Sequence, residues 1–340
     1  MRRLLAGVDI GGTKCAVVVG AATADEVLFL GKRSFPTPSD PRTAIGALSE
    51  ALAELLAEHA DAEGTGGALQ AIGISCGGPL DSARGRVLSP PNLPGWDDID
   101  VVGPFRERFG VPVALQNDAN ACALAEWRWG AGKGAQHMVF LTFGTGMGAG
   151  LILNGKLYAG ANDMAGEVGH VRLAEDGPRG YGKAGSFEGF CSGGGIARLA
   201  EDMIEDWRKL GRETLLGAPA ADGAPVEITA RHVAEAALAG DELAAVVIRL
   251  VGQQLGRGLA MLVDVLNPER IVIGSIYARQ ERLLAPIVLE ELRREALPNA
   301  LAACRILPSA LREQVGDAAG LSVAMHALEQ AGEAAISDRI

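Results

Sequence analysis

Two stretches of this chain, residues 7–20 and 140–153, repeat one pattern that limits the folds open to it. Each reads as an apolar strand, a turn rich in glycine and threonine, and a second apolar strand: GVDIGGTKCAVVVG in the first and FLTFGTGMGAGLIL in the second. Aligning Gly11 with Gly144 superposes the two turns. Two hairpins of one kind, each beginning a lobe, predict a duplicated fold with a cleft between the turns. The alternative is two unrelated glycine hairpins, which are common.

Strand-like segments alternate with helical patterns along the chain. Branched or Leu-rich runs bounded by Gly, Pro or Asn predict strands at 3–10, 14–20, 26–33, 69–75, 111–115, 137–143, 148–153, 168–173 and 270–274. The clearest helix begins after Asp241 and ends before Asn267, because apolar residues recur there every three or four positions. Other helical patterns lie at about 41–60, 119–129, 194–210, 279–296 and 315–330. The predicted class is α/β with mixed sheets, and 340 residues accommodate two domains.

Charge and composition exclude several classes of function. The net charge of −11 supplies no basic footprint, so we expect no nucleic-acid partner and no anionic membrane surface. No apolar run reaches the length of a membrane span, and the first residues lack the pattern of a signal peptide. The five cysteines are scattered and contain no Cys-x-x-Cys pair. The sequence therefore predicts a cytoplasmic protein with reduced cysteines.

The two glycine turns are suited to hold phosphate. Without a Cβ, glycine lets backbone N–H groups approach phosphate oxygens, and a neighbouring Thr hydroxyl or Lys ammonium completes the anion site. Neither turn is a P-loop, because no G-x-x-x-x-G-K-[ST] is present, and neither is a dinucleotide fingerprint, because a strand follows each turn. Asp9, at the end of the first strand, is suited to hold a magnesium ion or its waters.

An ordered set of motifs resembles the ROK family of sugar kinases and repressors. The motifs are Asp9-Ile-Gly-Gly-Thr-Lys14, Gln116-Asn-Asp-Ala-Asn-Ala121, Gly144-Thr-Gly-Met-Gly148 and Gly166-Glu-Val-Gly-His170. The resemblance runs over about 4–330 and implies a two-lobed actin-like ATPase fold, a duplicated ribonuclease H-like fold with mixed sheets. It also implies ATP and Mg²⁺ in the cleft. By that pattern one lobe holds 1–117 with 315–340, and the other holds 118–314.

The resemblance assigns roles residue by residue. It implies that Asp118 is the catalytic base that accepts the hydroxyl proton as the phosphoryl group is transferred. Sugar contacts are implied for Gly78, Asn117, Asp118, Glu167, His170 and Glu188. Phosphate or nucleotide contacts are implied for Asp9, Gly11, Gly12, Thr13, Lys14, Gly144, Thr145, Gly146 and Gly274, with magnesium held by Asp9 through water. Taken alone, Asn117-Asp118 reads as an ordinary helix N-cap, and a lone Glu or His here reads as a surface or metal-loop residue.

The chain departs from the family pattern in two places. Many members carry three zinc-binding cysteines after the histidine, where this sequence has Arg179, Tyr181 and Ser186. Structural zinc needs about four N or S ligands, and His170 cannot hold it alone, so we predict no zinc site. Ser275 stands where the family commonly has the second glycine of a pair. The repressors carry a DNA-binding domain ahead of the first hairpin, and we expect none here.

The predicted activity is ATP-dependent phosphorylation of a hexose hydroxyl. Glucose is the first choice of substrate, because Gly77-Gly78-Pro79-Leu80 and the segment 89–96 resemble the glucokinase-like branch. Fructose, allose, mannose and N-acetylhexosamines such as N-acetylmannosamine remain alternatives, since sequence does not display the geometry that reads one epimeric hydroxyl. A sugar-sensing protein without turnover and an actin-like structural ATPase are the competing classes. The family suggests a homodimer.

Overall fold

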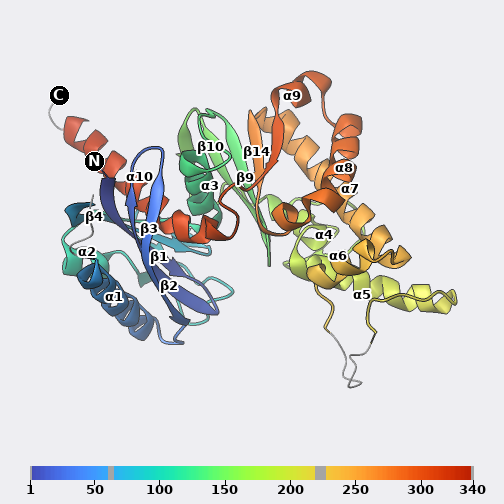
Figure 1. Ribbon diagram of the computed structural model, residues 1–340, viewed down its shortest axis with the longest axis horizontal. Helices are drawn as coiled ribbons and strands as arrows, with labels where there is room; N and C mark the ends of the chain where they lie inside the picture. The colour runs from blue at the N-terminus through green and yellow to red at the C-terminus, as the bar shows by residue number, and fades with distance from the viewer. Residues whose placement is uncertain (1, 60–64, 219–226, 338–340) are drawn as a thin grey trace. The chain divides into compact units, whose positions relative to one another are not determined.

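A computed structural model describes residues 2–59, 65–218 and 227–337 (Figure 1). Its first sheet has the strand order β3-β2-β1-β4-β8. These strands are β1 (Arg2–Ile10), β2 (Lys14–Ala22), β3 (Val27–Pro36), β4 (Thr65–Cys76) and β8 (Val113–Asn117). Strands β1, β2 and β3 form an antiparallel meander, and β4 and β8 continue the sheet in parallel to β1.

The second sheet repeats this order with later strands, as β11-β10-β9-β14-β15. These are β9 (Met138–Phe143), β10 (Met147–Leu153), β11 (Lys156–Tyr158), β14 (Arg270–Ile273) and β15 (Arg305–Pro308). Strands β14 and β15 are parallel to β9, as β4 and β8 are to β1. The α/β fold with mixed sheets that the sequence predicted is therefore confirmed, and the two glycine hairpins occupy equivalent places in two sheets of one topology.

Helices cover both faces of the first sheet. Helix α1 (Pro41–Glu58) is capped by Asp40, whose carboxylate accepts the Thr43 N–H at 2.8 Å, and it packs into the larger apolar core. On the opposite face runs α10 (Val315–Ser337), beside β1 and β4. The backbones meet closely there, because a Cβ on Gly73 would lie 2.1 Å from the carbonyl oxygen of Gly320.

A second group of helices packs around α7 (Glu242–Leu266), the longest helix. The group includes α5 (Gly193–Lys209), α6 (Ala230–Leu238), α8 (Ser275–Glu295) and α9 (Pro298–Ala303). By length and composition α7 alone among the described helices passes as a membrane span, yet 67% of its apolar window is buried inside the fold. Burial to that extent is typical of a core helix in a globular domain.

The chain divides into two compact units. The first contains residues 1–136, 150–165 and 313–340, and the second contains 137–149 and 166–312. This division assigns α3 (Asp118–Trp129) to the first unit. The lobes proposed from the resemblance, 1–117 with 315–340 and 118–314, stay a prediction.

Short elements fill the remaining described segments. They are β5 (Leu80–Asp81), β6 (Arg86–Val87), β7 (Ile99–Asp100), α2 (Gly103–Phe109), the 3-10 turns η1 (Val168–His170) and η2 (Arg312–Gln314), β12 (Arg179–Gly180), β13 (Lys183–Ala184) and α4 (Phe187–Phe190). The strand predicted at 168–173 is wrong, because η1 lies there. Gly169 packs so tightly that a Cβ would lie 2.2 Å from the Met147 carbonyl oxygen, and the chain turns rather than extends.

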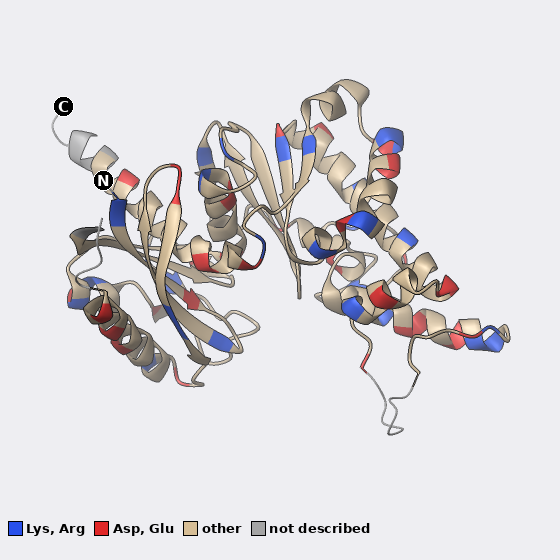
Figure 2. Ribbon diagram, viewed as in Figure 1, with Lys and Arg blue, Asp and Glu red and all other residues tan. Residues whose placement is uncertain are grey.

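Acidic and basic residues are interspersed over the outer helices (Figure 2). Helix α5, for example, carries both signs toward its C-terminal end, where Lys209 pairs with Glu205 and Asp206. Among the drawn, described residues no helix shows a continuous basic stripe. The expectation that nucleic acid is not a partner remains a prediction.

Candidate functional site

The first group of candidate site residues lies at the carboxyl ends of three parallel strands. In the sheet register Ile10 of β1 is opposite Cys76 of β4, which is opposite Asn117 of β8. Adjacent strands lie about 4.8 Å apart, so residues at these ends are close neighbours. Asp9, the Gly77-Gly78 pair and Asp118 therefore gather at one edge of the first sheet.

The turn between β1 and β2 is closed by backbone and threonine hydrogen bonds. The Gly11 N–H donates to the Lys14 carbonyl at 3.2 Å, and the Thr37 hydroxyl donates to the Gly11 carbonyl at 2.6 Å. Gly12, Thr13 and Lys14 are exposed. An exposed glycine turn that ends in a lysine can supply the backbone N–H groups and the ammonium group that an anionic phosphate requires.

Gly12 is fixed by a neighbouring loop that the motifs alone did not reveal. A Cβ on Gly12 would lie 2.3 Å from the carbonyl oxygen of Asn92, and Asn92 also lies beside Gly77. The Asn92 loop is closed by the Ser89 N–H, which donates to the Trp96 carbonyl at 2.9 Å, and Trp96 is fully buried. The segment 89–96 stood out in the sequence, but nothing in it indicated that Asn92 contacts Gly12.

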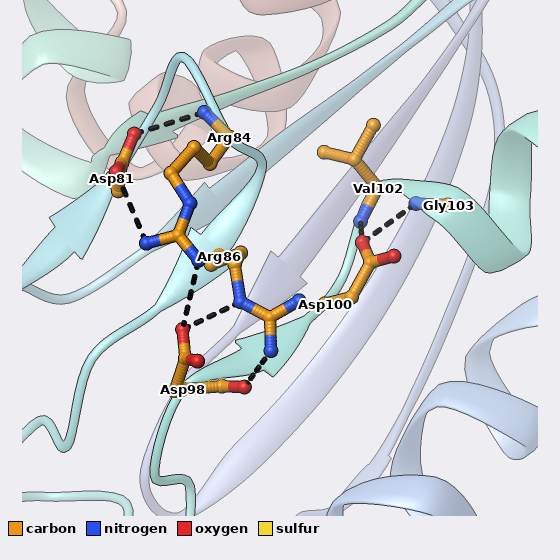
Figure 3. Close-up of polar contacts among 7 residues, drawn as sticks. All are labelled: Asp81, Arg84, Arg86, Asp98, Asp100, Val102 and Gly103. Carbon is orange, nitrogen blue, oxygen red and sulfur yellow. Dashed lines mark hydrogen bonds and ion pairs between the residues drawn. The ribbon is translucent and has the colours of Figure 1, made fainter.

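A polar network holds the small sheet of β5, β6 and β7 next to this loop (Figure 3). The Arg86 guanidinium donates from Nε to Asp98 Oδ1 at 2.5 Å, and Asp98 directly follows the loop. Asp81 accepts the Arg84 N–H at 2.9 Å. Asp100 accepts the Gly103 N–H at 2.8 Å, at the start of α2. The Arg86–Asp98 contact therefore joins the first residue of β6 to the residue before β7, the two strands that flank the Asn92 loop.

Asn117 and Asp118 sit where β8 becomes α3. The Ala119 N–H donates to Asn117 Oδ1 at 2.9 Å and to Asp118 Oδ1 at 2.8 Å. The N-cap interpretation is thus correct for Asn117. A role in the site is compatible with it, because the Ala119 N–H binds only one oxygen of each side chain, Asn117 Oδ1 and Asp118 Oδ1. The Asn117 amide also lies 3.3 Å from the place of a Cβ on Gly78.

Both carboxyl groups at this edge have raised pKa values. Burial, with the negative charge of Asp118 as the second cause, raises the pKa of Asp9 to about 6. Water reaches Asp118, but the surrounding protein displaces much of the solvent that would stabilise its charge, and this desolvation raises its pKa. The Ala119 N–H opposes the shift. Two acids held near each other with raised pKa values are typical of a functional site.

The second group of candidate site residues surrounds the turn between β9 and β10. The Gly144 N–H donates to the Gly146 carbonyl at 3.1 Å, and the Gly144 carbonyl accepts the Gly193 N–H at 2.7 Å. Gly193 begins α5, whose N-cap Ser192 accepts the Gly195 N–H at 3.0 Å. The turn that includes Thr145 therefore lies against a capped helix N-terminus, a favourable setting for an anion.

Gly274 places a further helix start beside the same turn. Its N–H donates to the Leu141 carbonyl at 3.0 Å, and it is the N-cap of α8. Ser275 follows with a left-handed φ of 49°, and a Cβ on Gly144 would lie 3.4 Å from the Ser275 hydroxyl. The residue that departs from the family pattern thus has its hydroxyl within van der Waals distance of the second glycine turn.

Glu167, His170 and Glu188 lie in the same unit as this second turn. Glu188 Oε2 accepts the Met147 N–H at 3.1 Å, so its carboxylate is hydrogen-bonded at the end of the turn. Gly169, between Glu167 and His170, packs against Met147, and a Cβ on it would lie 3.3 Å from the Cβ of Glu188. The structure therefore brings η1, Glu188 and the second turn together.

The predicted site residues fall into one group on each unit. The first unit carries Asp9, Gly11, Gly12, Thr13, Lys14, Gly78, Asn117 and Asp118, and the second carries Gly144, Thr145, Gly146, Glu167, His170, Glu188 and Gly274. Sequence reasoning missed Asn92 and Gly193, because only packing across the chain places them against the glycine turns.

A zinc ion does not fit the donor set after His170. Arg179, Tyr181 and Ser186 supply no thiolate or imidazole, and all five cysteines are free thiols elsewhere in the fold. Within residues 2–59, 65–218 and 227–337, no three His, Cys, Asp or Glu side chains are grouped as metal ligands. The expectation that this loop binds no zinc stays a prediction.

Comparisons with known proteins place the chain among kinases and repressors of sugar metabolism. The model of the ROK family matches residues 5–327. A glucokinase of Streptomyces coelicolor is 31% identical over 319 residues, 94% of this chain and 95% of the relative. The crystal structure of a ROK family glucokinase from Streptomyces griseus in complex with glucose and AMPPNP is 30% identical, has a TM-score of 0.72, and its match covers 95% of this chain and 99% of that chain. The DNA-binding transcriptional repressor Mlc of Escherichia coli is 32% identical over 232 residues, 68% of this chain and 54% of the repressor.

Proposed function

Because the chain belongs to the ROK family, we propose that it is an ATP-dependent sugar kinase with Asp118 as the general base. Its duplicated mixed sheets are those of the actin-like ATPase fold. The observation that carries the proposal is the carboxylate of Asp118, which has a raised pKa and lies near Asp9 at the strand ends that also hold the first glycine turn.

The proposed reaction transfers the γ-phosphoryl group of ATP to one hexose hydroxyl. Asp118 accepts the proton of that hydroxyl, the hydroxyl oxygen forms a bond to phosphorus, and the bond to the β-phosphate oxygen breaks to release ADP. A base with a pKa raised toward neutrality accepts this proton more readily than an ordinary carboxylate. Lys14 and the backbone N–H groups at Gly12 and Thr13 bind phosphate oxygens, and the Gly144–Gly146 turn is a second candidate for a phosphate contact.

Magnesium fits the group of candidate site residues on the first unit. Asp9 is a half-buried carboxylate whose charge is disfavoured by burial and by Asp118, so a nearby cation relieves both effects. Asp9 would hold the ion through water, and the bound ion would neutralise charge on the phosphate oxygens. Asn117, Gly78, Glu167, His170 and Glu188 would contact sugar hydroxyls.

Glucose is the substrate we propose first, since the relatives named above include glucokinases. Mannose, fructose, allose and N-acetylmannosamine are the alternatives. The second candidate function is sugar sensing without phosphorylation of the sugar, because the repressor Mlc is equally similar to this chain where the two align. We further propose that the protein is a homodimer, as the family resemblance implied, and that it is cytoplasmic, as its composition predicted.

A panel of sugars tests the proposal directly. Release of ADP from Mg·ATP is measured without sugar and with each of the five sugars, and binding of each sugar is measured by calorimetry. We expect one sugar to raise the rate of ADP release about 100-fold or more, because an oriented sugar hydroxyl and the base Asp118 then act together. A sugar that binds without raising ADP release would identify a sensor. If none of the sugars binds, both candidate functions are wrong.

The raised pKa values predict the pH profile of the reaction. We expect kcat/KM to fall as pH drops through about 6, because protonation of Asp9, whose pKa is raised to about 6, removes a charge that the site requires. Asp9 contributes to the stability of the fold with the opposite pH dependence, since this contribution is larger at low pH. The fold favours neutral Asp9, so this contribution is full below the ordinary value of 3.8 and is lost as pH rises through about 6. Initial rates measured from about pH 3.5 to 9 check the kcat/KM profile, and an acid limb near pH 4 would contradict it.

A further inference from the structure

The loop after His170 carries a small hairpin with an unusual residue at its tip. Strands β12 and β13 pair Arg179 with Ala184 and Gly180 with Lys183, which leaves Tyr181 and Gly182 as the turn. Both turn residues are left-handed, with φ of 45° and 79°. Such turns favour Gly, Asn or Asp at the first position, so a tyrosine there is strained. Strain of this kind persists where surrounding contacts determine the conformation.

The Tyr181 ring contacts the ring of His170. The centroids are 5.0 Å apart and the planes make an angle of 84°, an edge-to-face arrangement. Tyr181 is 69% exposed, so it is not a core residue. The residue with the strained backbone thus places an exposed aromatic ring against one of the proposed sugar ligands.

The hairpin is tied to the same segment by further hydrogen bonds. Lys183 Nζ donates to the His170 carbonyl at 2.6 Å, and Arg198 donates to the Arg179 carbonyl at 2.7 Å. Ser186, which is fully buried, donates to the Lys183 carbonyl at 3.2 Å and accepts the Gly189 N–H at 3.0 Å as the N-cap of α4. The hairpin is therefore fixed both to η1 and to the helix that carries Glu188.

From these contacts we infer that Tyr181 is a positioning residue, which fixes the orientation of the His170 ring for the sugar. The inference rests on the proposed function for the role of His170. The side chains at positions 179, 181 and 186 cannot bind zinc. The contact with the Tyr181 ring therefore constrains the His170 ring in place of a metal. A free imidazole would rotate among orientations of which only a fraction can meet a sugar hydroxyl, and apparent affinity falls by that fraction.

Three variants separate positioning from a general loss of structure. Tyr181→Ala removes the ring, Tyr181→Phe keeps it, and Tyr158→Ala is the matched control, because Tyr158 on β11 is also exposed, at 51%. We expect Tyr181→Ala to raise the KM for sugar about two- to tenfold, the range that corresponds to the interaction free energy of one aromatic pair. The values of kcat and of the KM for ATP should stay unchanged. Tyr181→Phe and Tyr158→Ala should match the parent protein.

A second measurement does not depend on turnover. The imidazole C–H signals of the five histidines are recorded by NMR, and the His170 signal is assigned by its loss in His170→Gln. We expect Tyr181→Ala to shift only the His170 signal, because the ring current of Tyr181 is removed, and Tyr181→Phe to preserve it. The parent protein should contain far less than one zinc per chain by elemental analysis.

The outcomes distinguish this inference from the proposed function. An unchanged His170 signal in Tyr181→Ala overturns the inference, and so does an unchanged KM for sugar in an active enzyme. A protein that phosphorylates no sugar refutes the proposed function, while the NMR measurement still decides whether Tyr181 orients His170. Near-stoichiometric zinc would overturn the inference, since the loop would then be held by metal.

Discussion

Replacing Asp118 by asparagine is expected to lower kcat about 10²–10⁴-fold, the usual contribution of a positioned general base. Asparagine cannot accept the hydroxyl proton, but its amide oxygen can still accept the Ala119 N–H that Asp118 accepts at 2.8 Å. The melting temperature should not fall, because burial disfavours the charge of Asp118 and the neutral amide removes that cost. Steady-state ADP release and differential scanning calorimetry measure the two effects.

The matched control is Asp202→Asn, the same chemical change at an exposed position on α5. It should leave both kcat and the melting temperature unchanged. Calorimetric titration should also show that Asp118→Asn still binds sugar, since Asn117, Glu167 and His170 remain. Near-parental turnover in Asp118→Asn would refute the assignment of the base.

Adding one methyl group at Gly73 is expected to destabilise the first unit by about 3 kcal/mol, at the upper end of what overpacking usually costs. The new Cβ would lie 2.1 Å from the Gly320 carbonyl oxygen and 2.3 Å from the Ala324 nitrogen. Both are backbone atoms of α10, so relief requires the whole helix to shift. The transition of the first unit should move down by about 6–12 °C, since 1 kcal/mol corresponds to about 2–4 °C in chains of comparable size.

Gly46→Ala is the control, because it makes the same change inside α1 where nothing lies within 4 Å of the new Cβ. We expect it to stabilise the protein by about 0.5–1 kcal/mol, the entropic penalty of glycine inside a helix. Calorimetric scans of the two variants therefore shift in opposite directions. Equal melting temperatures for Gly73→Ala and the parent would contradict the close packing of α10 on β4.

Much of the fold could be predicted because its strands and long helices carry strong local patterns. Strands β1 and β9 are apolar runs that end in glycine turns, and α7 has both its apolar period and its N-cap, Asp241. The segment 168–173 was mistaken for a strand because it is a short run that contains two valines and a leucine. In the structure Gly169 packs against Met147, a long-range contact that no local pattern contains.

The candidate site was predictable to the extent that its residues lie in motifs. Asp9 and Asn117-Asp118 could be placed because they lie at the ends of strands, and the carboxyl ends of parallel strands meet at one edge. Asn92 and Tyr181 could not be assigned, because their partners, Gly12 and His170, are reached through loops whose paths depend on long-range packing. Short strands such as β12 also bury too little apolar surface to produce a pattern.

The return of α10 to the first sheet sets the order in which this protein can mature on the ribosome. The strands β1 and β4 emerge early, but the helix that seals their glycine-lined face belongs to residues 315–337 and is synthesised well after them. At about 5–20 residues per second the interval is about ten seconds to a minute. The second unit, whose segments lie within 137–312, can be complete before the first one closes. The nascent first unit must therefore wait with one sheet face uncovered, where a chaperone can hold it until α10 arrives.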